Sequence, residues 1–277
     1  IRRSVSATYT RAISVPASTD CGCATPSADA GWARSVGYTD EDIAAAAGDA
    51  AGQSLGCGHP LASCRIQPGD VVLDLGSGAG LDLGLAAARV APGGRAVGVD
   101  MTDAMNEAAR SNAAAAGRDD LEVRRGFIED LPVLDASVDW VISNCAINLS
   151  PDKPAVFREI ARVLRSDGRM VICDIVADAL PEGIRASQAL YDACIAGAAP
   201  EAVYLDGLRD AGLLEVEVTR RTPLDPTRLT PLVDAATPGL EQMAGCCGSS
   251  PTREALGAMA PILAGTLAAV EIRARKP

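Results

Sequence analysis

The stretch VVLDLGSGAG, residues 71–80, joins a short apolar run to a glycine-rich loop. An apolar run that ends at a glycine predicts a buried strand, and the pattern after the loop predicts a helix. Glycines let a ligand approach the backbone closely, and the first turn of a helix presents free N–H groups. The dinucleotide spacing GxGxxG is not met, because Leu81 and Leu83 occupy the two positions where its third glycine would fall. The stretch therefore predicts a strand–loop–helix ligand site of another kind.

The alternation of strand and helix continues beyond this loop. Further strands are expected at RAVGVD (95–100), LEVRRG (121–126), SVDWVISN (137–144) and RMVICDIV (169–176). Helices are expected at 81–90, at 102–117 with Thr102 as N-cap, and at 152–168. This order predicts an α/β fold of the Rossmann-like class, with a mostly parallel sheet covered by helices on both faces.

The ends of the chain lie outside this alternation. Residues 1–66 and 226–277 are rich in Ala, Gly, Ser and Pro, and together they hold six of the nine cysteines. We therefore expect an N-terminal cysteine-bearing segment (1–66), a ligand-binding core (67–225) and a small C-terminal domain (226–277).

The composition argues against several classes of function. The 277-residue chain has a formal net charge of −11 and no run of Lys or Arg, so nucleic acid and anionic membranes are not expected partners. No apolar run approaches the roughly 20 residues of a membrane span, and the opening segment lacks the apolar core of a signal peptide. Nine cysteines, an odd number, fit a reducing compartment better than a disulfide framework. We expect a cytoplasmic monomer.

Acidic residues at strand ends mark the predicted ligand site. Asp74, two residues before GxGxG, makes the loop resemble the first motif of S-adenosylmethionine-dependent methyltransferases; the alternative is that Asp74 only caps the loop. Asp100 ends the second strand, where its carboxylate can accept from both hydroxyls of a ribose, and Met101 can pack on adenine. The predicted cofactor-binding residues are Asp74, Gly76, Ser77, Gly78, Gly80, Asp100, Met101, Ile128, Glu129 and Asn144.

The cysteines of the core differ in what their positions predict. Cys145 follows the fourth strand at the carboxyl edge, where open α/β sheets bind ligands, so it should face the methyl donor. Cys57 lies between glycines in a loop that should expose it, and Cys194 lies shortly before a glycine, downstream of the fifth strand. Two others are expected to be small core residues: Cys64 and Cys173.

Several blocks of the sequence together resemble the arsenite methyltransferases. The resemblance covers roughly residues 20–220, and it is carried by SLGCGHP, VLDLGSGAG, GVDMT, SNCAINLSPDK, FREIARVLRSDGRMVICDI and CIAGA. It implies that Cys57, Cys145 and Cys194 bind trivalent arsenic, As(III), and that Cys21 or Cys23 is a redox partner. The implied function is methyl transfer from S-adenosylmethionine to arsenite, or to a methylated or organic As(III), supplied as a thiol conjugate.

The chemistry of the acceptor agrees with this resemblance. Trivalent arsenic is soft, so three thiolates satisfy it while its lone pair stays free. Attack by that lone pair on a methyl group needs positioning and exclusion of water, with no general base. The chain has a single histidine, His59, which either lowers the pKa of Cys57 or has a structural role.

Methyl transfer oxidises arsenic, so the resemblance also implies a thiol reductant, glutathione or thioredoxin. The pair Cys21 and Cys23 suits thiol exchange, and the alternative is that it has no role. Cys246 and Cys247 either handle arsenic or have no special role. A zinc site formed by these four thiols is a third alternative, although their spacing departs from the usual pattern.

Two other functions stay open. One is a class I methyltransferase of another small molecule; the other is a thiol-rich protein that binds arsenic without catalysis. A carbon or nitrogen acceptor usually needs a base or an aromatic pocket, and the chain has only two Phe, two Trp, four Tyr and one His. A sequestering protein needs no methyl-donor loop. The number of methyl groups added and the preferred arsenical are not predicted.

Overall fold

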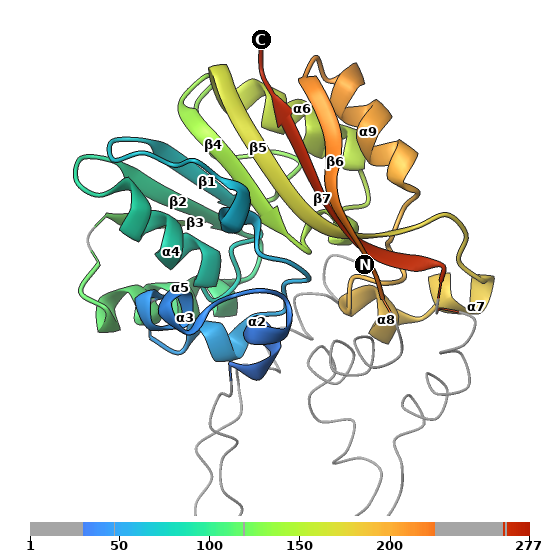
Figure 1. Ribbon diagram of the computed structural model, residues 1–277, viewed down its shortest axis with the longest axis horizontal. Helices are drawn as coiled ribbons and strands as arrows, with labels where there is room; N and C mark the ends of the chain where they lie inside the picture. The colour runs from blue at the N-terminus through green and yellow to red at the C-terminus, as the bar shows by residue number, and fades with distance from the viewer. Residues whose placement is uncertain (1–29, 47, 119, 225–262, 264) are drawn as a thin grey trace, which may run out of the picture.

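The computed structural model describes residues 30–46, 48–118, 120–224, 263 and 265–277. Within them a seven-stranded sheet has the order β3-β2-β1-β4-β5-β7-β6 (Figure 1). Its strands are β1 (Val71–Leu75), β2 (Arg95–Asp100), β3 (Leu121–Arg125), β4 (Val138–Asn144), β5 (Leu164–Ala177), β6 (Leu214–Pro223) and β7 (Leu267–Arg275). The strands from β3 to β5 are parallel. The predicted α/β class with a mostly parallel sheet is confirmed.

The register brings the carboxyl ends of the first strands together. Leu75 at the end of β1 is level with Val99 on one side and Ser143 on the other. Asn144 at the end of β4 is level with Cys173 of β5. Because β2 precedes β1 in the sheet order and β4 follows it, the chain reverses its direction of winding at β1. Ligands of open α/β sheets bind at such a switch point.

The seventh strand differs from the sequence-based prediction. β7 lies between β5 and β6 and is antiparallel to both, so residues 267–275 belong to the core sheet. The expected boundary at 226 is therefore wrong for this segment. Val270, Ile272 and Ala274 are buried at alternate positions, and this period of two is the signal that identifies the strand.

Helices cover both faces of the sheet, as Figure 1 shows. On one face, α6 and α9 bury Phe157 and Tyr204 against β1 and β5. On the other, α4 and the segment before β1 bury Leu83 and Leu61 against Val72 and its neighbours. The helices are α2 (Gly31–Ser35), α3 (Asp40–Ala45), α4 (Leu81–Val90), α5 (Asp103–Ala115), α6 (Lys153–Val163), α7 (Glu182–Arg185), α8 (Gln188–Asp192) and α9 (Glu201–Asp210), with 3-10 turns η1 (Ala50–Gln53), η2 (Pro60–Ser63) and η3 (Ile147–Leu149).

Helix ends follow local chemistry. The Thr102 side chain accepts from the backbone of Met105 at the start of α5, as its predicted N-cap role requires. The helix expected at 152–168 ends earlier, at Val163, because Leu164 is already extended and begins β5. No helix in the described ranges has both the length and the apolar character needed to cross a membrane.

Candidate functional site

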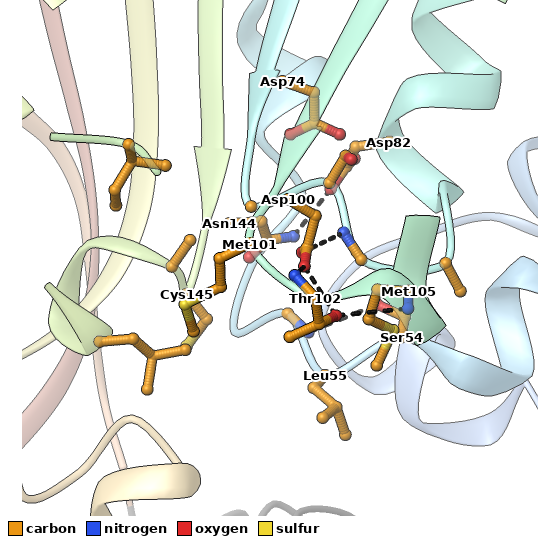
Figure 2. Close-up of a pocket in the computed structure, with 18 of the residues that line it drawn as sticks. Ser54, Leu55, Asp74, Asp82, Asp100, Met101, Thr102, Met105, Asn144 and Cys145 are labelled. Carbon is orange, nitrogen blue, oxygen red and sulfur yellow. Dashed lines mark hydrogen bonds between the residues drawn. The ribbon is translucent and has the colours of Figure 1, made fainter. Parts of the chain in front are cut away.

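A cavity of about 1070 Å³ opens at the carboxyl ends of β1, β2 and β4. We call it the glycine-loop pocket; Figure 2 shows it lined by Asp74, Asp82, Asp100, Met101, Asn144 and Cys145, among others. Every predicted cofactor-binding residue lines it except Gly80. Gly80 is instead the N-cap of α4, where it packs near Ala109 of α5.

The glycine loop needs glycine for two different reasons. Gly76 and Gly78 both have positive φ, at 68° and 51°, a region that side chains disfavour. A Cβ on Gly76 would also collide with the Cβ of Ala146, whereas a Cβ on Gly78 would meet open space. The first glycine therefore permits close contact with the loop after β4, and the second leaves the backbone open to the cavity.

Asp100 is held in place and keeps accepting capacity. Its Oδ1 accepts from the backbone N–H and the hydroxyl of Thr102, both at 2.9 Å, and its Oδ2 accepts from the N–H of Gly78 at 3.1 Å. A carboxylate oxygen has two lone pairs, so Oδ2 retains one for a hydroxyl in the cavity. Burial raises the pKa of Asp100.

Asp74 presents an unpartnered carboxylate oxygen. It is buried near the end of β1, and its Oδ2 accepts no hydrogen bond from any described residue. Burial, followed by the charges of Asp82 and Asp100, holds the pKa of Asp74 well above its usual range. Asp82 is stabilised by donors from Tyr38 at 2.7 Å and Asn144 at 3.0 Å. Among the described residues, no Lys or Arg lines this acidic end of the pocket, which fits a positively charged ligand.

Three cysteines from separate segments meet beside this pocket. Cys57, Cys145 and Cys194 belong to one buried cluster, with exposures of 9%, 5% and 4%. The Cys194 thiol donates to the carbonyl oxygen of Cys145 at 2.7 Å. Of the three, Cys145 lines the glycine-loop pocket. The sequence-based expectation that Cys145 faces this cavity agrees with its place in the structure.

Backbone strain and thiol pKa values mark the same cluster. Cys145 and Cys194 have φ values of 63° and 61°, a region that costs residues other than glycine about 1–3 kcal/mol each. Hydrogen bonds with Cys194 and Cys57, together with burial, hold the pKa of Cys145 well above its ordinary value. The hydrogen bond with Cys145 lowers the pKa of Cys57, but burial and the charge of Asp174 raise it by more. The pKa of Cys57 is therefore raised overall. The raised pKa values of Cys57 and Cys145 favour the protonated form of these two thiols until a thiophilic group binds.

Asn144 holds the loop that carries Cys57. Its Oδ1 accepts from the backbone N–H groups of Cys57 at 2.9 Å and Gly58 at 3.2 Å. Its Nδ2 lies within hydrogen-bond distance of the Gly58 carbonyl oxygen, the Tyr38 hydroxyl and Asp82. The side chain predicted to bind a cofactor thus lines the pocket and uses its polar atoms to fix a thiol-bearing loop.

A second cavity of about 640 Å³ reaches the cluster through Cys57. We call it the Cys57 pocket; Cys173, which is buried in the core as predicted, also lines it. His59 lines it as well, with its ring stacked on Tyr38 and Nδ1 3.3 Å from the carbonyl oxygen of Gly37. The pKa of Cys57 is raised overall, so the role of His59 in lowering it stays a prediction. Cys64 is half-buried and donates to the carbonyl oxygen of Pro60.

This geometry agrees with the comparisons to known proteins. Residues 66–237 match the family described as "Methyltransferase domain". The chain belongs to this methyltransferase family.

Relatives of the methyltransferase extend the resemblance seen in the sequence. An arsenite methyltransferase of Halobacterium salinarum is 42% identical over 207 residues, 74% of this chain and 53% of the relative. One of Aquipseudomonas alcaligenes is 40% identical over 151 residues, 52% of this chain and 43% of the relative. The chain thus spans about half the length of these curated relatives, or less. The solved arsenic(III) S-adenosylmethionine methyltransferase of Chlamydomonas reinhardtii has a TM-score of 0.58 and 27% identity, covering 88% of this chain and 72% of that one.

Sequence reasoning missed the buried polar groups around the methyltransferase's thiols. One Asp174 oxygen and the sulfur atoms of Cys57 and Cys145 lie within 4.8 Å of one another. Asp174 accepts from Tyr204 at 2.9 Å and from the backbone of Asn148, and burial raises its pKa to about 6. The sequence did contain a signal for Asp174, because this residue lies toward the carboxyl end of β5. The same position, an acidic residue near the carboxyl end of a strand, identified Asp100. Four predicted thiols lie outside the described residues: Cys21, Cys23, Cys246 and Cys247.

Proposed function

We propose that this chain transfers a methyl group from S-adenosylmethionine to trivalent arsenic held by Cys57, Cys145 and Cys194. The observation that carries the proposal is the meeting of these three buried thiols beside the glycine-loop pocket, with Cys145 lining it. The likeness to arsenite methyltransferases supports the same acceptor.

The residues of the glycine-loop pocket fit the proposed cofactor. S-adenosylmethionine supplies an activated methyl group on a sulfonium ion. The unpartnered oxygen of Asp74 suits its ammonium group, and the remaining lone pair of Asp100 Oδ2 suits a ribose hydroxyl. Met101, Ile128 and Glu129 line the same cavity and would contact the base. The positive φ of Gly76 and Gly78 keeps Cβ atoms out of the ligand's path.

The thiols suit an acceptor that needs no base. Soft trivalent arsenic binds three thiolates and keeps a lone pair, which attacks the methyl group once the two are aligned. Burial of the cluster excludes water from this step. The chain's one histidine, His59, lines the Cys57 pocket and does not line the glycine-loop pocket. A carbon, nitrogen or oxygen acceptor that must lose a proton is therefore less well served than arsenic.

Turnover requires electrons as well as methyl groups. Transfer from the lone pair raises arsenic to the pentavalent state, and two thiols that form a disulfide return it to the trivalent state. A thiol reductant, glutathione or thioredoxin, must then reduce that disulfide. We propose Cys21 or Cys23 as the redox partner thiol within the chain.

The test combines an activity assay with a matched cysteine control. Purified protein is incubated with arsenite, glutathione and S-adenosylmethionine labelled at the methyl group, and methylated arsenicals are separated and counted. Cys145→Ser should abolish methylation while S-adenosylmethionine still binds, and Cys64→Ser should leave methylation unchanged. Undiminished methylation by Cys145→Ser would refute the three-thiol site. Arsenic binding without label transfer would favour the sequestering function, and label transfer to other acceptors alone would favour another methyltransferase.

A further inference from the structure

The cysteine cluster separates two cavities. Cys145 lines the glycine-loop pocket, whereas Cys57, which is hydrogen-bonded to Cys145, lines the Cys57 pocket. The Cys57 pocket lies among α2, the loop before η2, β5, β6 and β7, and no residue lines both cavities. A molecule in the second cavity would therefore reach the thiols without entering the first.

The polar lining of the Cys57 pocket favours an anionic ligand. Arg220 lines it, and the Arg220 side chain forms no hydrogen bond or ion pair with any residue in the described part of the chain. The Glu271 carboxylate is already paired with Arg273, and the same oxygen, Oε1, accepts from the hydroxyls of Ser63 and Thr219, both at 2.6 Å. In a chain with a net charge of −11, an unpaired guanidinium at a cavity is a local attraction for carboxylates.

A second polar group in the same lining lacks a partner. His59 is 4% exposed, and within the ranges that the structure describes its Nε2 forms no hydrogen bond. Its Nδ1 lies 3.3 Å from the carbonyl oxygen of Gly37 and 4.0 Å from Asp42, which makes Nδ1 the donor and leaves Nε2 as an acceptor in the neutral ring. A buried unpartnered acceptor is costly unless a ligand supplies a donor such as an amide N–H.

We infer that the Cys57 pocket binds the carrier thiol of the arsenical, a small peptide-like thiol with carboxylate groups, and that arsenic enters the cysteine cluster from this side. The inference rests on the proposed function. In the first exchange the Cys57 thiol displaces one carrier. An As–S bond to Cys57 forms, the As–S bond to that carrier breaks, and the proton of Cys57 leaves on the released carrier thiol. Arsenic stays trivalent throughout.

The geometry of methyl transfer favours ligand exchange away from the glycine-loop pocket. The lone pair of bound arsenic must point at the methyl group in that pocket, so the three As–S bonds point away from the methyl group. A carrier thiol displaced by Cys57 is thus released away from the methyl donor. Arsenic can then exchange its ligands while the cofactor remains bound.

The first experiment asks whether a filled glycine-loop pocket blocks uptake. Trp32 donates to the carbonyl oxygen of Gly56, next to Cys57, so its fluorescence in a Trp140→Phe background can report arsenic uptake. The protein is mixed rapidly with the glutathione conjugate of arsenite, with and without saturating S-adenosylhomocysteine. We expect the same uptake rate, within about twofold, in both cases.

The second experiment asks whether Arg220 recognises the carrier. Arg220→Ala should slow uptake from the anionic glutathione conjugate about tenfold, as the loss of one charge-assisted hydrogen bond predicts. Uptake from the neutral mercaptoethanol conjugate should be unchanged. Arg221→Ala is the matched control, because Arg221 is its neighbour on β6, does not line the pocket and pairs with Glu201.

Two results would overturn the inference alone: uptake blocked by S-adenosylhomocysteine, or equal rates for Arg220→Ala and the unmodified protein with the glutathione conjugate. If the unmodified protein takes up arsenic from neither conjugate, the proposed function fails, and this inference fails with it.

Discussion

Replacing Asn144 with Ala should detach the loop that carries Cys57 while leaving the sheet intact. The change removes an acceptor of the buried N–H of Cys57, an acceptor of the Gly58 N–H, and a donor to Asp82. An unsatisfied buried donor costs about 1–3 kcal/mol. Gly58 is only half-buried, so water can replace part of its loss. The total should be about 2–4 kcal/mol.

The variant should bind arsenic more weakly by about this free energy, because binding by all three thiols requires the loop of Cys57 to be in its native position. A cost of about 3 kcal/mol corresponds to roughly a 100-fold loss of affinity. The assay titrates the protein with arsenite, which can take three thiolates, and follows Trp32, whose indole N–H donates to the carbonyl oxygen of Gly56 in the same loop. Urea unfolding measures stability in parallel.

The control for this prediction is Asn106→Ala. Asn106 is buried, whereas Asn144 is partly buried, and the Asn106 amide donates to the carbonyl oxygens of Asp100 and Thr102, on the cofactor side. It should weaken S-adenosylmethionine binding and leave arsenical affinity within about twofold. Asn144→Ala with arsenical affinity as high as that of the unmodified protein would refute the role of Asn144 in positioning Cys57.

Three further predictions concern pH and the glycine loop. The raised pKa of Asp74 keeps its carboxyl group protonated to higher pH than usual, so affinity for S-adenosylmethionine should rise with pH. Asp74→Asn should remove this pH dependence in calorimetric titrations, and an unchanged profile in the variant would contradict the role of Asp74. The raised pKa values of Cys57 and Cys145 predict that uptake of phenylarsine oxide accelerates up to about tenfold per pH unit between pH 7 and 9, and a flat rate in stopped-flow measurements would count against protonated thiols. Gly78→Ala should lower the free energy of unfolding by about 1 kcal/mol, because of its positive φ alone. Gly76→Ala should lower it by about 2–4 kcal/mol, because its Cβ also meets Ala146. Equal losses in urea unfolding would be inconsistent with that contact.

The sequence predicted those parts of the site that lie at the carboxyl ends of parallel strands, where open α/β sheets bind ligands. Asp74, Asp100 and Cys145 each lie at the end of a strand, and a strand end can be recognised from local pattern. β7 was missed because its partners, β5 and β6, are distant in sequence. A pairing of this kind is fixed by the whole sheet.

The second cavity and the polar network were missed for a different reason. Cys173 reads as a core residue, and it is buried; its exposure to the Cys57 pocket depends on how the loop at Gly58 packs against it. Asn148 reads as part of a turn, yet its amide donates to the carbonyl oxygens of Ile175 and Cys194. Contacts between loops that are far apart in the chain leave no periodic signal in either loop.

The segment Asn144–Asn148 explains how one short stretch can organise three thiols. Its first residue fixes the loop of Cys57, its second is Cys145, and its last holds the carbonyl oxygen of Cys194. The left-handed backbone at Cys145 and Cys194 would relax if these contacts did not hold it. Because Cys145 is already hydrogen-bonded with both Cys194 and Cys57, the proposed binding of arsenic would not have to order three separate segments of the chain. The free energy of the As–S bonds can then contribute to affinity and to aligning the lone pair with the methyl group.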